Sequence, residues 1–96
     1  MTNQEFYNSL KAEKERLMNE SEQAFNDCQT KHGEMLRALH EVEALEQADK
    51  FGTQELSDAY DAHDKARHAS MLADNYFDDV DEAIDKINEL MSLYTD

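Results

Sequence analysis

Carboxylates are the most abundant side chains in this sequence that could do chemistry. The 96 residues include 23 Asp and Glu against 9 Lys and Arg, which gives a formal net charge of −14 at pH 7. This charge would repel polyanions, so we expect neither nucleic acid nor an anionic membrane as a direct partner. Basic proteins are the partners that it favours.

The acidic residues form two patterned sets. In the first half of the chain they recur at every seventh position, which on a helix gives a ladder with rungs about 10 Å apart. The acidic ladder consists of Glu13, Glu20, Asp27, Glu34 and Glu41. The second set, the acidic cluster, consists of Asp74, Asp78, Asp79, Asp81, Glu82, Asp85 and Glu89. Such carboxylates can imitate the phosphates of a nucleic acid and fill a basic groove, and an ordinary solvated surface is the alternative.

The remaining reactive residue types argue against catalysis and against a metal site. Four histidines occur without a Glu-x-x-His pair, at His32, His40, His63 and His68. The acidic cluster lacks the central glycine and alternating ligands of a calcium-binding EF-hand loop. The lone cysteine, Cys28, falls on an apolar stripe, which indicates a packing role. We therefore expect no enzymatic activity, no metal and no cofactor.

Two long helices are predicted to carry these carboxylates. The chain has no proline and only two glycines, so helix is favoured almost throughout. In the second half, apolar side chains recur at alternating steps of three and four residues, a heptad seam that only a helix presents as one stripe. The seam comprises Leu56, Ala59, His63, Ala66, Ser70, Ala73, Phe77, Val80, Ile84, Ile87, Met91 and Tyr94. A similar seam in the first half comprises Tyr7, Leu10, Leu17, Ala24, Cys28, Met35, Ala38, Val42 and Leu45, with polar interruptions.

The predicted turn lies at Lys50-Phe51-Gly52-Thr53. Gly52 is expected to adopt the positive φ that ends the first helix, and Thr53 is expected to cap the second. Gly33 is another candidate break, but the heptad phase runs through it unchanged, so we expect a continuous helix there. The predicted organisation is a single helical domain over 1–96, with helices at 3–49 and 53–94 and a turn at 50–53.

This organisation predicts an all-α fold, a long antiparallel helical hairpin that resembles a coiled coil. Some large apolar residues lie outside the two seams, namely Met18, Phe25, Leu39, Tyr76 and Leu90. A lone hairpin has little core and would leave these residues partly in water. We therefore expect a homodimer that buries them in a four-helix assembly.

The N-terminal residues lack the basic and apolar regions of a signal peptide, and no apolar run approaches the roughly 20 residues that span a bilayer, so a cytoplasmic protein is expected. In acidity and size the chain is similar to phage-encoded inhibitors and nuclease immunity proteins, an analogy of composition rather than of motif. The leading hypothesis is a non-enzymatic acidic inhibitor or regulator that binds the nucleic-acid-binding surface of a basic protein, such as a nuclease. The alternative is a structural coiled-coil scaffold or adaptor that associates through its apolar edges.

Overall fold

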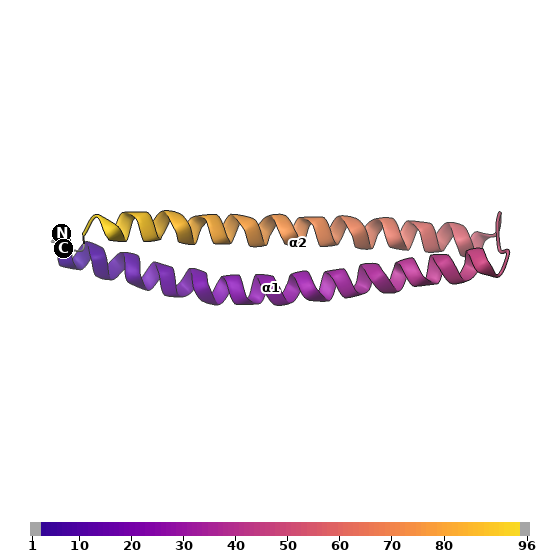
Figure 1. The fold of residues 1–96 in the computed structure, drawn as a ribbon, viewed down its shortest axis with the longest axis horizontal. Coiled ribbons are helices and arrows are strands. Elements are labelled where there is room, and N and C mark those ends of the chain that lie inside the picture. Colours follow the sequence, from indigo (N-terminus) through magenta and orange to yellow (C-terminus); the bar gives the residue numbers. More distant parts are fainter. Residues whose placement is uncertain (1–2, 95–96) are drawn as a thin grey trace. The chain divides into compact units, whose positions relative to one another are not determined.

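The structure is a computed structural model that describes residues 3–94, which form two long helices joined by a turn (Figure 1). Helix α1 spans Asn3–Gln47 and helix α2 spans Gln54–Ser92. Residues 3–94 contain no strand, so the all-α prediction is confirmed. Helix α1 continues through Gly33 without a break, as the unchanged heptad phase indicates.

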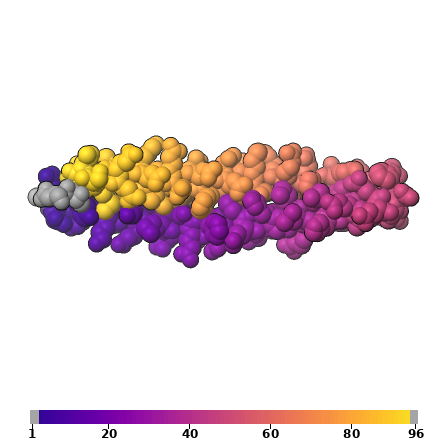
Figure 2. All heavy atoms as spheres, viewed as in Figure 1, coloured from indigo at the N-terminus to yellow at the C-terminus, as the bar shows by residue number. Residues whose placement is uncertain are grey.

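The chain divides into two compact units, each with one segment of α1 packed against one segment of α2. The terminal unit combines Met1–Phe25 with Asn75–Asp96, and the turn unit consists of Asn26–Asp74. Within each unit the two helical segments run antiparallel (Figure 1). On the face shown in Figure 2, the side chains of the paired segments meet along their length.

The core of the turn unit follows the predicted seam. Val42, Leu56 and Ala59 form a buried cluster, and Leu45 packs against it. Further from the turn, the buried residues are Cys28, Ser70 and Ala73. Small side chains are frequent in this core, which makes it narrow.

The terminal unit uses the same seam with larger residues at its margins. Leu17, Ala24 and Val80 are buried, and Phe77 is half-buried. The rings of Phe25 and Phe77 lie against each other with centroids 5.9 Å apart, and those of Phe6 and Tyr94 are 5.1 Å apart. The last predicted seam residue, Tyr94, is exposed because it lies beyond the end of α2.

Helix α1 ends earlier than predicted, and Asp49 closes it. The amide of Asp49 donates to the carbonyl of Glu46 at 3.1 Å, and the amide of Lys50 donates to the carbonyl of Leu45 at 3.0 Å. With Asp49 at a φ of 57°, these bonds form a Schellman motif. The positive φ predicted for Gly52 is confirmed, but the prediction that Gly52 would close this helix was wrong. Aspartate also tolerates the left-handed conformation, and Asp49 comes first in the chain.

Gly52 serves the following turn instead. Its φ is 77°, and the amide of Thr53 donates to the carbonyl of Lys50 at 3.2 Å. The third residue of such a four-residue turn can require a positive φ, which glycine adopts without strain. The Thr53 hydroxyl oxygen accepts a hydrogen bond from the amide of Leu56 at 3.3 Å, so the prediction that Thr53 caps the second helix is confirmed.

Candidate partner-binding surface

Most of the acidic cluster lies exposed on the terminal unit's segment of α2. The exposed members are Asp78, Asp79, Asp81, Glu82, Asp85 and Glu89. Among residues 3–94, one ion pair involves this group, a 3.9 Å contact between Lys86 and Glu82. This stretch of α2 therefore presents mainly uncompensated negative charge to solvent.

Asp74, the first member of the cluster, lies in the turn unit and is engaged there with α1. Its Oδ2 atom lies 3.2 Å from Nε2 of His32, and the Cys28 thiol forms a second hydrogen bond to the carboxyl. The His32 contact, followed by the Cys28 contact, lowers the pKa of Asp74 below its ordinary value. Asp74 thus links the two helical segments, in addition to any role toward a partner.

The Cys28, His32 and Asp74 group does not have the arrangement of a catalytic triad. A nucleophilic cysteine is activated by a histidine that takes its proton. Here the thiol and the imidazole both contact the same carboxylate, which is the pattern of a structural link. In residues 3–94 no group of three or more His, Cys, Asp or Glu side chains is placed to hold a metal ion.

The acidic ladder is divided between the two units, and Arg16 engages its first two rungs. Arg16 donates a hydrogen bond to Glu20 at 3.0 Å and another to Glu13 at 3.1 Å. The bond to Glu13 lowers the pKa of that carboxyl. Glu20 also accepts a hydrogen bond from the Tyr76 hydroxyl, which raises the pKa of Tyr76. The remaining rungs, Asp27, Glu34 and Glu41, are exposed on the turn unit. Sequence reasoning missed the Arg16 clamp, although its spacing of three and four residues from the two glutamates signals it.

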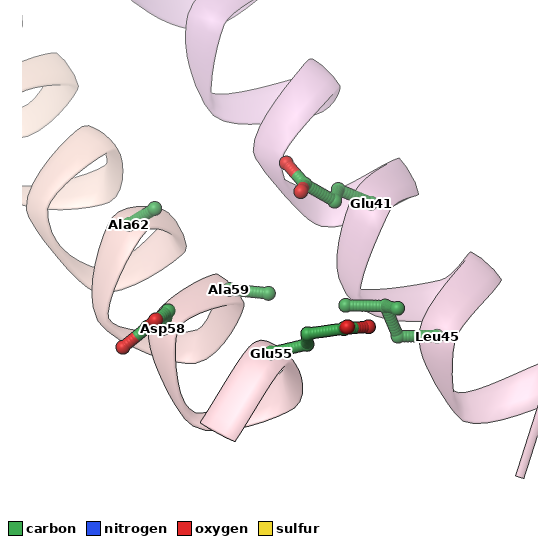
Figure 3. Close-up of a pocket in the computed structure, with 6 residues that line it drawn as sticks. All are labelled: Glu41, Leu45, Glu55, Asp58, Ala59 and Ala62. Carbon is green, nitrogen blue, oxygen red and sulfur yellow. The ribbon is translucent and has the colours of Figure 1, made fainter. Parts of the chain in front are cut away.

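A hollow of about 440 Å³ in the turn unit brings further carboxylates near the seam. Its lining residues are Glu41, Leu45, Glu55, Asp58, Ala59 and Ala62 (Figure 3). Leu45 and Ala59 point toward each other, Glu55 reaches toward Leu45, and Asp58 points away (Figure 3). The carboxylates of Glu55 and Asp58 point in different directions, so they do not form a paired acid and base. The hollow is a shallow depression beside two small alanines.

The residues predicted for self-association fall on different sides of the helix pairs. Met18 lines a groove with Asp81 and Ile84, whereas Tyr76 lines another hollow with Arg16 and Glu20. Met18, Phe25, Tyr76 and Leu90 are exposed, while Leu39 is half-buried in the turn unit. A single flat interface therefore does not collect all five residues.

No helix within residues 3–94 combines the length and apolar character needed to cross a membrane. Comparison with protein-family models, with curated proteins and with solved structures found no match.

Proposed function

We propose that the protein is a non-enzymatic inhibitor or regulator that uses its acidic cluster to occupy the basic, nucleic-acid-binding surface of another protein. The observation that carries the proposal is the exposure of six carboxylates between Asp78 and Glu89 on one stretch of α2. Lys86 is the basic residue within that stretch. A partner with lysines and arginines at matching positions would compensate the remaining charge and associate rapidly.

The spacing of these carboxylates supports mimicry of a nucleic acid. Asp78 and Glu89 are eleven residues apart, so the six carboxylates span about 16 Å of the helix axis at about 1.5 Å per residue. Their mean axial separation is therefore about 3.3 Å. One strand of DNA carries a phosphate about every 3.4 Å, so a groove that binds one strand would meet a similar charge density on α2.

The proposed partner is a basic cytoplasmic protein, such as a nuclease or another nucleic-acid-binding protein. Nucleic acid itself is not a proposed ligand, because the net charge of −14 repels it. The proposed mode of action is competition, in which the protein fills the groove that the nucleic acid would otherwise enter.

A structural scaffold is the second candidate, and the exposed apolar residues of α2 favour it. Tyr76, Leu90 and Leu93 are 48%, 43% and 74% exposed. Tyr76 and Leu90 are fourteen residues apart, which is two heptads, so they lie toward one side of α2, and Leu93 follows directly after the end of this helix. Burial of this side against a second copy would produce a homodimer of four helices with a larger shared core.

Capture from the native host is the experiment that tests the leading proposal. The immobilised protein is exposed to host extract, bound proteins are eluted with rising salt, and each is identified by mass spectrometry. A captured basic protein is then purified and loaded with a fluorescent oligonucleotide. The proposal predicts that the acidic protein displaces the oligonucleotide and that added salt weakens the displacement.

Two variants with the same net charge make this test specific for the cluster. The cluster variant combines Asp78→Asn, Asp79→Asn, Glu82→Gln and Asp85→Asn. The control variant removes four charges from the turn unit by Glu43→Gln, Asp49→Asn, Asp58→Asn and Asp61→Asn. Only the cluster variant should lose affinity for the captured protein, most visibly at low salt.

Equal affinities of wild type and cluster variant, with both folded by circular dichroism, would contradict the mimicry proposal. The scaffold candidate predicts a mass of about twice the 11.1 kDa chain by light scattering. It also predicts association that is insensitive to salt or strengthened by it, because apolar contacts respond in that way.

A further inference from the structure

The terminal unit contains a groove that combines apolar side chains with acidic margins. The Met18 groove is lined by Lys14, Met18, Ser21, Asp81, Ile84 and Asn88. Met18 is 53% exposed. Phe25, two helical turns further along α1, is 50% exposed and continues the apolar side toward Phe77. The helix pair thus leaves two large apolar side chains of α1, Met18 and Phe25, about half exposed on this side.

On α2, a row of carboxylates borders the Met18 groove. Asp81 lines the groove directly. Asp78 lies three residues before Asp81 and Asp85 lies four residues after it, so helical spacing places all three on the same side of α2. All three side chains are exposed and can meet cations of a docked partner.

On α1, a further carboxylate stands beside the apolar side chains. Glu22 is exposed and lies four residues after Met18 and three residues before Phe25, between the two on the helix surface. Lys14 is the one cation among the described residues that line the groove. The lining itself therefore has one charge of each sign, Lys14 and Asp81, around the apolar side chains of Met18 and Ile84. The neighbouring Asp78, Asp85 and Glu22 give the margins their acidic excess.

We propose that the Met18 groove binds a basic amphipathic helix of a partner protein, which packs on the terminal unit as a third helix. This inference rests on the proposed function and specifies how the basic partner meets the protein. Met18 and Phe25 are about 10 Å apart along α1, which matches the i, i+7 repeat of apolar side chains on a docking helix. The carboxylates on both helices are placed to meet lysines and arginines beside that apolar stripe.

A second copy of this chain fits the Met18 groove less well than a basic helix does. Each copy would bring four carboxylates, those of Glu22, Asp78, Asp81 and Asp85, and one lysine, Lys14, to such an interface, and this excess of like charge opposes association. Tyr76 lies at a separate hollow beside Arg16 and Glu20. A homodimer formed through the Tyr76 side would therefore leave the Met18 groove open.

The test uses a synthetic peptide of about 20 residues, with leucine at alternating three- and four-residue steps and lysine at the other positions. A scrambled peptide of the same composition scatters the leucines around the helix and keeps the charge. The groove variant combines Met18→Gln with Phe25→Gln, and Met18→Gln alone serves as a milder change. The control variant replaces two exposed leucines elsewhere on the terminal unit, by Leu90→Gln and Leu93→Gln.

Affinity is measured by fluorescence anisotropy, with helicity followed by circular dichroism. The ordered peptide should bind at least about tenfold more tightly than the scrambled one, because only it presents an apolar stripe. The groove variant should lose this preference and Met18→Gln should lose part of it, whereas the control variant should stay within about twofold of wild type.

Equal binding of ordered and scrambled peptides that still weakens with salt would overturn the groove inference while leaving the charge-based proposal standing. A wild-type dimer that becomes monomeric only in the groove variant would also overturn it, because a second copy would then occupy the groove. The proposed function fails separately, if the captured host protein binds the cluster variant as tightly as wild type.

Discussion

Replacement of Asp49 by asparagine or glycine should stabilise the protein, although Asp49 makes the hydrogen bond that ends α1. Asp49 holds a φ of 57°, which is unfavourable for a residue with a Cβ atom. Its carboxylate also lies at the negative end of the α1 dipole, and the last turn of α1 has no basic residue to offset it. Asp49 therefore destabilises the folded state in two ways, through its left-handed backbone and through its charge at the helix end.

The size of each cost follows from the geometry. An unfavourable charge at a helix end costs about 0.3–1 kcal/mol at low salt, so Asp49→Asn should raise the free energy of unfolding by that amount. Asp49→Gly also removes about 1 kcal/mol of left-handed strain and loses about 0.5–1 kcal/mol through the greater freedom of glycine in the unfolded chain. The glycine variant should therefore gain about 1 kcal/mol, or a rise in Tm of about 4–8 °C for a domain of this size.

Urea and thermal unfolding followed by circular dichroism, at low and high salt, measure these changes. Asp61→Asn is the matched control, because it removes one exposed charge from the interior of α2. The gain of Asp49→Asn should fade at high salt, and the additional gain of Asp49→Gly should persist. The dipole explanation would be refuted if Asp61→Asn stabilised the protein as much as Asp49→Asn, since total charge would then be the cause.

Two further predictions concern single residues of the turn unit. Gly33→Ala should raise the free energy of unfolding by about 0.5–1 kcal/mol, because Gly33 is inside α1 and an added Cβ meets nothing within 4 Å. A loss of stability in urea unfolding would show that this position needs glycine. The lowered pKa of Asp74 means that its ionised form stabilises the folded state above the ordinary carboxyl pKa, and that this contribution disappears as pH falls through the lowered value. Asp74→Asn should therefore be less stable than wild type at pH near 6 and equal to it in strong acid, and a difference that stays constant over this range would refute the link to His32 and Cys28.

The helices and the buried seam could be predicted because heptad spacing is a local property of the sequence. From Leu56 to Met91 every predicted seam residue is buried or half-buried in its unit. The end of α1 could not be placed in the same way, because Asp49 and Gly52 both tolerate a positive φ. Hydrogen bonds to the carbonyls of Leu45 and Glu46 decide between them, and composition does not reveal those bonds.

The sequence predicted which acidic residues are exposed on the candidate surface, but it did not predict the contacts between side chains of the two helices. Heptad positions indicate that Asp78, Asp81 and Asp85 lie outside the seam, and all three are exposed. The contact of Asp74 with His32 depends on the register between two helices, which the spacing within either helix leaves open. The Met18 groove depends on the same register, since its lining comes from both α1 and α2.

The narrow core has a consequence for how long an unbound molecule survives in a cell. Folded domains are favoured over the unfolded chain by only about 5–15 kcal/mol, and none of the described residues is both large and completely buried. A partner present at about a hundred times its Kd adds about 2.7 kcal/mol, a large share of such a total. Molecules held by the proposed partner should therefore resist proteases longer than free ones. Degradation of the free excess would keep the amount of this protein in proportion to the amount of the proposed partner.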